Sequence, residues 1–109
     1  MKTYTEFHGG IEVKNIGKRL RKICKREKMF KIMTGYGSSS GVSLSKNSAI
    51  KSLSKMKKEG IIKGFFPGEV KNILLDEKSI YYEDKLIFSN LVKNDNDYGN
   101  DGIIFVFVK

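Results

Sequence analysis

The chain has 109 residues, enough for one domain but too few for two domains enclosing an active site, so we expect residues 1–109 to form a single domain. Hydrophobic residues make up 39% and charged residues 30%, which suits a small folded core and excludes a disordered chain. Lys and Arg number 21 against 12 Asp and Glu, so the net charge of +9 favours a polyanionic partner. A single cysteine and a single histidine exclude an internal disulfide and zinc sites built from Cys or His clusters.

The sequence contains no segment typical of a signal peptide or of a membrane span. Its first ten residues lack an apolar stretch, and no uncharged apolar run approaches the roughly 18 residues that a span needs. We therefore expect a cytoplasmic protein with no membrane partner. Cys24 falls among apolar positions, so we expect a packed, reduced thiol rather than a nucleophile.

The first helix is predicted within a basic segment, residues 14–31, which holds nine basic residues and one acidic residue. An apolar stripe recurs at helical spacing and consists of Ile16, Leu20, Ile23 and Cys24, with Asn15 as the expected N-cap. The cations that point away from this stripe are Lys18, Arg21, Lys22 and Lys25, and those that flank it are Arg19, Arg26 and Lys28. Of these, we expect Lys18, Arg19, Arg21, Lys22 and Lys25 to contact phosphate. Because like charges at helical spacing repel, we interpret this surface as an anion-binding face rather than an ordinary solvated face.

A second helix is predicted from residue 45 onward, in a segment with six basic residues and one acidic residue between positions 46 and 63. Ser45 is the expected N-cap, and Gly60 is the expected left-handed residue that ends the helix. The apolar stripe consists of Ala49, Ile50, Leu53 and Met56. The lysines expected to extend the anion-binding face are Lys46, Lys51, Lys55 and Lys58, although those near the C-terminal turns also favour the helix dipole.

Short apolar runs separated by turn residues make up most of the remaining chain and predict β-strands. We expect strands at residues 3–7, 11–13, 30–36, 61–66, 70–75, 79–82, 86–88 and 103–108. The first two predict a hairpin, and those after residue 60 predict an antiparallel meander. The last run is apolar on both faces, so it is expected to be a central strand or an edge strand covered by another protomer.

The loop at residues 35–41 is rich in glycine and serine and precedes the second helix. Its residues Gly37, Ser38, Ser39 and Ser40 suit a phosphate cradle beside the helix N-terminus, with a plain connector as the alternative. The glycine spacing matches neither the P-loop nor the dinucleotide-binding pattern, so nucleotide hydrolysis is not expected. Candidates for stacking on bases are Tyr36, Phe66 and Tyr82, with core or surface aromatics as the alternative.

The run Gly-Val-Ser-Leu-Ser-Lys-Asn-Ser-Ala-Ile-Lys-Ser-Leu-Ser-Lys-Met-Lys-Lys-Glu-Gly-Ile-Ile, residues 41–62, resembles part of the winged helix-turn-helix proteins, which bind DNA through the major groove. The resemblance covers about a fifth of the chain and includes the turn, the recognition helix and the first wing strand. It implies groove-facing roles for Ser45, Lys46, Asn47 and Lys51, and a phosphate contact in the wing for Lys63.

The acidic residues suggest no catalytic or metal centre. The loop at residues 94–102 fails the calcium-binding EF-hand pattern because, counted from Asp95, glycine falls at the wrong position and Val106 occupies the place of the final glutamate. A minor alternative is a nuclease or phosphotransferase, for which Glu6, His8 and Glu12 would have to converge with later acids. We expect no enzymatic activity, no metal and no cofactor.

Taken together, these patterns predict an α+β fold in which two basic amphipathic helices pack on a mostly antiparallel β-sheet. The expected function is non-enzymatic binding of a polyanionic phosphate ligand, DNA or RNA. One alternative is a phage or mobile-element inhibitor that engages a host nucleic-acid-guided defence complex, and another is a protein that sequesters a nucleotide or cyclic nucleotide signal. A homodimer is also expected, formed through the apolar and acidic second half, because the basic helices would repel each other.

Overall fold

The apolar C-terminal run forms the centre of the sheet. In the computed structural model, which describes residues 1–35 and 43–109, β4 (Ile103–Val108) pairs antiparallel with β2 (Met29–Met33) and with β3 (Ile62–Pro67). β1 (Lys2–Tyr4) pairs parallel with β2, so the strand order is β1-β2-β4-β3. All six residues of β4 are buried because both faces of the sheet are covered, which confirms the predicted central strand.

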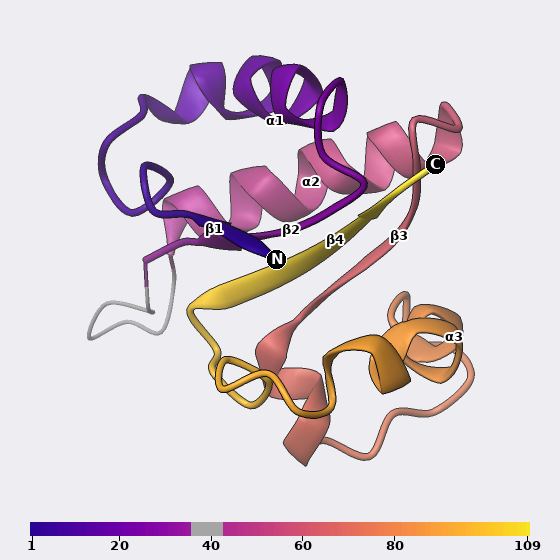
Figure 1. The fold of residues 1–109 in the computed structure, drawn as a ribbon. Helices are drawn as coiled ribbons and strands as arrows, with labels where there is room; N and C mark the ends of the chain where they lie inside the picture. The colour runs from indigo at the N-terminus through magenta and orange to yellow at the C-terminus, as the bar shows by residue number, and fades with distance from the viewer. Residues whose placement is uncertain (36–42) are drawn as a thin grey trace.

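Helices α1 (Ile16–Cys24) and α2 (Leu44–Lys58) lie side by side on one face of the sheet (Figure 1). Their apolar stripes are confirmed: the side chains with no exposed surface are Ile16, Leu20, Ile23, Ala49, Leu53 and Met56. They pack on Ile104 and Val106 of β4, whose side chains alternate toward this face. The fold is therefore α+β, with two basic helices on a mostly antiparallel sheet, as predicted.

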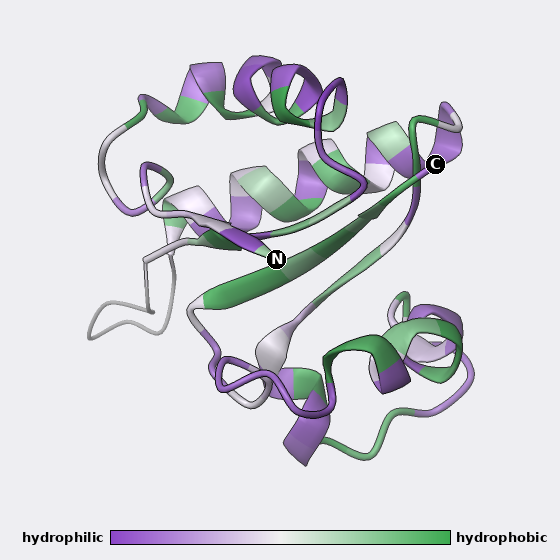
Figure 2. Cartoon of the chain, viewed as in Figure 1, coloured by the Kyte–Doolittle hydropathy of each residue, from purple (hydrophilic) through white to green (hydrophobic). Residues whose placement is uncertain are grey.

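The opposite face of the sheet is covered by α3 (Tyr82–Val92) and by the short 3-10 helix η2 (Gly68–Asn72). Phe105 and Phe107 of β4 point to this side, and the ring of Phe88 in α3 stacks on Phe107 with centroids 4.5 Å apart. Figure 2 shows the result: β4 is hydrophobic along its whole length, whereas α1 alternates between hydrophilic and hydrophobic positions. The molecule thus has three layers, with α1 and α2 above the sheet and α3 below it.

The predicted N-terminal hairpin is wrong. Only Lys2–Tyr4 is a strand, and its partner is β2 rather than residues 11–13. The chain turns after β1, where Phe7 inserts fully into the core and Gly9 adopts a positive φ of 86°. A second 3-10 helix, η1 (Val13–Asn15), then leads into α1. The apolar residues of this segment anchor a loop to the core. Apolar periodicity alone could not distinguish a hairpin from an anchored loop.

The predicted meander after residue 67 is also wrong. Residues 70–75 contain most of η2, and residues 79–82 and 86–88, which we expected to be strands, belong to the turn before α3 and to α3 itself. Glu83 and Asp84, which lie between two of the expected strands, belong to the first helical turn of α3. The helical period was hidden because α3 carries apolar residues on its exposed side as well as on its buried side.

The predicted ends of the two basic helices are confirmed only in part. Ser43, not Ser45, caps α2, because its hydroxyl accepts a hydrogen bond from the N–H of Lys46. Gly60 adopts a positive φ of 78° after α2, as predicted. Asn15 occupies the N-cap position of α1 without a side-chain capping bond. Within residues 1–35 and 43–109, no helix has the length and apolar character required to cross a bilayer.

Candidate polyanion-binding surface

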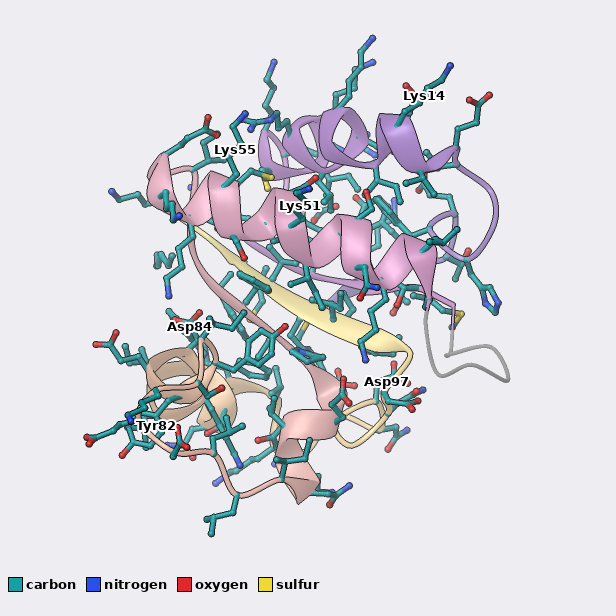
Figure 3. All side chains as sticks on the ribbon, turned by 180° about the vertical axis from the view of Figure 1, so that it is seen from behind. Lys14, Lys51, Lys55, Tyr82, Asp84 and Asp97 are labelled. Carbon is teal, nitrogen blue, oxygen red and sulfur yellow. The ribbon has the colours of Figure 1, made fainter. Side chains whose placement is uncertain are left out.

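Six exposed lysines gather on the outer surfaces of α1 and α2, and we call this surface the lysine face. Its members are Lys18, Lys22 and Lys25 at α1 and Lys51, Lys55 and Lys58 on α2. On each helix the spacing is four residues and then three, which aligns the side chains in one ridge. At 1.5 Å rise per residue each ridge is about 10 Å long, and packed helices lie about 8–10 Å apart. Figure 3 shows Lys51 and Lys55 on the outer side of α2, next to α1.

Within residues 1–35 and 43–109, none of these six lysines forms a salt bridge. Two acids of the same layer are held by other cations. Nη2 of Arg21 lies 2.8 Å from Oε1 of Glu59, which ties the end of α1 to the end of α2. Nε of Arg19 lies 2.8 Å from Oε2 of Glu6 in the loop after β1. The lysine face therefore keeps its positive charge.

Arg19 combines a structural role with a position at the edge of this surface. Its hydrogen bond to Glu6 raises the pKa of the guanidinium further, so Arg19 stays charged at any physiological pH. Beside it lies a depression of about 320 Å³, whose lining is formed by Glu6, Ile11, Asn15, Lys18, Arg19 and Lys22. Arg19 and Arg21 were both predicted to contact phosphate, but each already has an internal carboxylate partner.

Lys46, another predicted phosphate contact, points away from the lysine face. Its ammonium forms a short ion pair with Glu69 in η2. Since η2 lies on the other side of the sheet from α2, the pair links the two outer layers. Lys63 is exposed on strand β3, outside the two helices. Among the described residues, the predicted cations thus separate into six lysines on the helices without a salt bridge, three residues with an internal carboxylate partner (Arg19, Arg21 and Lys46), and Lys63 on β3.

A buried carboxylate that the sequence did not reveal lies at the edge of the sheet. Asp84 is 2% exposed, and its carboxylate accepts hydrogen bonds from Nζ of Lys57 at 2.9 Å and 3.0 Å and from the backbone N–H of Phe65 at 3.1 Å. β3 is an edge strand with an irregular register near Gly64. Asp84 therefore satisfies an N–H that the ladder leaves free, and Lys57 reaches round the edge from α2 to neutralise it.

A second buried ion cluster joins β2 to the loop before β4. Nζ of Lys31 donates to Asp95 at 3.0 Å and to Asp97 at 2.8 Å, and the Lys31 side chain is 10% exposed. Burial alone would lower the pKa of Lys31, but the two aspartates outweigh it and the pKa is raised. Burial likewise opposes ionisation of Asp95, while the N–H of Asp97 and the ammonium of Lys31 lower its pKa overall. The acidic loop is therefore a structural partner of Lys31.

The predicted stacking residues do not form a common platform. Phe66 is wrong as a stacking candidate: it has no exposed surface and packs against Tyr98, Phe105 and Phe107. Phe65, its neighbour in β3, is also buried. Both faces of the sheet are covered, so Phe65 packs in the core on the α1–α2 side and Phe66 packs in the core on the α3 side. Tyr82 is half-buried at the start of α3, on the far side of the sheet from the lysine face (Figure 3).

Part of the predicted site lies outside the described residues. Tyr36 and the proposed phosphate cradle Gly37, Ser38, Ser39 and Ser40 belong to residues 36–42. At the described borders of that segment, the hydroxyl of Ser45 accepts a hydrogen bond from the N–H of Gly35.

The residues of the nuclease alternative have separate partners. Glu6 binds Arg19, Glu12 lies 3.4 Å from Lys14, and His8 is exposed. Among residues 1–35 and 43–109, no three His, Cys, Asp or Glu side chains gather in a group suited to a metal ion. Burial raises the pKa of Cys24 to about 11, so its thiol stays protonated at neutral pH and is a poor nucleophile.

The connection between the two basic helices bears on the helix-turn-helix resemblance. Strand β2 lies between α1 and α2 in the chain, so the two helices are not joined by a short turn. Of the four residues that the resemblance places in a groove, Ser45 and Lys46 make internal bonds, while Asn47 and Lys51 are exposed. Comparison of the chain with protein-family models, with curated proteins and with solved structures finds no match.

Proposed function

We propose that the protein binds a polyanionic phosphate ligand, DNA or RNA, through the lysine face and without catalysis. The observation that carries the proposal is the set of six exposed lysines in two adjacent ridges, with no acidic partner in the described chain. Lysines four residues apart on a helix repel each other by a few tenths of a kcal/mol. Six other cations of the described chain pair with acids, whereas none of these six lysines does, so a surface left wholly cationic is best accounted for by a ligand that supplies the negative charge.

The dimensions of the lysine face suit a nucleic-acid backbone. Duplex DNA carries one negative charge per about 1.7 Å of its axis, so a ridge of about 10 Å lies beside roughly six phosphate charges. Two helices packed side by side offer a broad surface rather than a single helix that enters the major groove. Phosphate contacts position a protein without reading bases, so we expect weak sequence specificity.

The test is a binding titration with labelled duplex DNA, duplex RNA and single strands at several salt concentrations. We expect affinity to fall about a thousandfold between 50 mM and 200 mM salt if about six phosphates are neutralised. The double variant Lys22→Glu/Lys55→Glu should bind more weakly on every sequence, and its logarithmic salt slope on duplex DNA should be shallower by about 2, since each lost contact removes about 0.9.

The matched control is the double variant Lys71→Glu/Lys78→Glu. Both lysines are exposed, both belong to the η2–α3 half, and the change in net charge is the same. This control should retain nearly all of the affinity. An equal loss in both double variants would show that total charge, not the lysine face, governs binding, and affinity that does not change with salt would contradict the proposal.

The same titration includes mononucleotides and cyclic nucleotides, because a nucleotide-sequestering protein is the alternative among small ligands. A face that contacts many phosphates gains little from a ligand with one or two of them. We therefore expect small nucleotides to compete only at much higher concentration than the polymers. Tight binding of a small nucleotide, insensitive to Lys22→Glu/Lys55→Glu, would favour the alternative.

A further inference from the structure

The outer side of α3 is apolar although it is open to solvent. Leu86, Ile87 and Leu91 are 65%, 61% and 60% exposed, and together with Glu83 and Asn90 they form one continuous stripe along the helix. The spacing explains this: the five positions fall on one side at 100° per residue, while Asp84, Phe88 and Val92 fall on the other side and pack on the sheet. We call these five residues the α3 stripe. A surface helix normally carries polar residues there.

The α3 stripe continues into a wider apolar surface. The segment before α3 exposes three more aliphatic side chains, Ile73, Leu74 and Ile80, and Leu74 is fully exposed. Between this segment and the helix lies a depression of about 250 Å³, lined by Leu74, Leu75, Tyr82, Lys85, Leu86 and Ser89. Leu74, Leu86, Ile87 and Leu91 with Ile73 amount to a few hundred Å² of exposed apolar surface, the range at which a patch on a soluble protein marks an interaction site. Ile80 lines a separate depression with Ser54, Lys57, Lys58 and Phe65.

We propose that this surface is the interface of a homodimer, in which the α3 helices of two copies pack antiparallel across a two-fold axis. A two-fold interface uses the same patch on both copies, so the patch must complement itself. The α3 stripe meets this condition: its apolar centre is Ile87 with Leu86 and Leu91 on either side, and the depression beside the helix offers space for an aliphatic side chain of the other copy.

Charge at the two ends of α3 supports the antiparallel arrangement. Glu83 is exposed in the first turn and Lys93 is exposed at the C-terminal end. When two copies of the helix run in opposite directions, Glu83 of each copy lies near the lysine end of the other, and the helix dipoles oppose each other favourably. A parallel pair would instead bring like charges together at both ends.

The position of α3 also favours a second copy over a different use of this surface. The lysine face belongs to α1 and α2, which lie in the layer on the other side of the sheet (Figure 1). Residues 69–102 hold eight acids and four lysines, so contact through this half avoids the repulsion between the basic helices. A dimer built this way leaves both lysine faces open. The interface differs from the terminal strand β4, which is central and needs no cover.

The experiment measures the mass of the full chain by light scattering and by sedimentation, without nucleic acid, from low to high micromolar concentration. We expect a mass that rises toward twice 12.4 kDa. Ile87→Glu places two carboxylates at the centre of the interface and should give a monomer at every concentration, with unchanged helical circular dichroism because the side chain is exposed. The matched control is Leu44→Glu, an exposed leucine at the start of α2, which should dimerise normally.

A charge-reversal cycle tests the direction of the helices. Glu83→Lys and Lys93→Glu should each weaken dimerisation by about tenfold, because each change is made twice in a two-fold interface, and the double variant should restore it. A wild-type chain that stays monomeric at high micromolar concentration would overturn the proposal. Dimers that persist in Ile87→Glu would overturn it as well, and a double variant as weak as the single variants would refute the antiparallel arrangement.

Discussion

Lys31 illustrates how a single residue can be misjudged when its partner is distant in the sequence. It belongs to the most basic segment of the chain, yet its ammonium is buried between Asp95 and Asp97, more than 60 residues away. Two carboxylates and one ammonium satisfy each other because the loop before β4 folds over β2. Removal of the lysine would leave two close carboxylates without a counter-ion, which costs more than removal of a surface pair.

We predict that Lys31→Met lowers the free energy of unfolding by about 2 kcal/mol at neutral pH, between the values for an exposed and a fully buried ion pair, because the two aspartates are partly exposed. The pKa of Asp95 is lowered by folding, so in the wild type this group stabilises the protein above about pH 4 and the contribution is lost as pH falls through the lowered value. The variant should lose that part of the acid sensitivity. Urea denaturation of both proteins between neutral and acidic pH measures it, and parallel stability curves would contradict the prediction.

Leu20 and Leu53 are the residues on which the two helix assignments depend. Both have no exposed surface and belong to the core between the helices and the sheet. Leu20→Ala and Leu53→Ala should each destabilise the fold by about 2 to 5 kcal/mol, because each leaves a cavity where the surroundings relax only in part. Neither side chain reaches the lysine face, so nucleic-acid affinity of the folded variants should not change. A loss below about 1 kcal/mol in urea would contradict the assigned faces.

Between elements, two glycines allow neighbouring backbones to approach. A Cβ at Gly17 of α1 would lie 2.9 Å from the hydroxyl of Ser52 on α2. At Gly64 of β3, it would lie 2.6 Å from a carboxylate oxygen of Asp84 and 2.8 Å from the ring of Phe88. The hydroxyl can rotate away, whereas the carboxylate is held by Lys57 and by the N–H of Phe65.

This difference predicts unequal effects of the same substitution. Gly64→Ala should destabilise the fold by about 1 to 3 kcal/mol, because α3 must move away from β3. Gly17→Ala should cost less, since alanine also has a better helix propensity than glycine. Thermal unfolding of the two variants side by side measures the difference. A larger loss at Gly17 would mean that the α1–α2 contact is tighter than the α3–β3 contact.

For the molecule as a whole, the concentration of positive charge on one face lowers the stability of the free protein. The net charge is +9, and six lysines of one face repel each other within reach of a Debye length of about 10 Å at 0.1 M salt. We predict that added salt stabilises the free protein, opposite to its effect on nucleic-acid binding. Lys22→Glu/Lys55→Glu should melt at a higher temperature than the wild type at low salt, with the gap closing at high salt. An equal gap at every salt concentration would exclude repulsion as its cause.

Sequence patterns were reliable where one side of an element is polar and the other apolar. The stripes of α1 and α2 were predicted residue by residue, and the continuous apolar run of β4 indicated a strand buried on both faces. The same reasoning failed for α3, because its exposed side is apolar too and no period stands out. It also failed for the partner and the extent of the first strand, since β1 ends at Tyr4 and pairs with β2 rather than with residues 11–13.

The sequence by itself determined the fold class, the two basic helices, the central strand and the clustering of positive charge in the first half. These follow from local spacing, because burial of one side of a helix or of both sides of a strand leaves a repeat in the chain. Only the tertiary structure decided which cations are free. Arg19, Lys31 and Lys46 find acids 13 to 66 residues away, a choice made by the packing of layers that no local pattern encodes. The same packing buried Phe66 and exposed the α3 stripe.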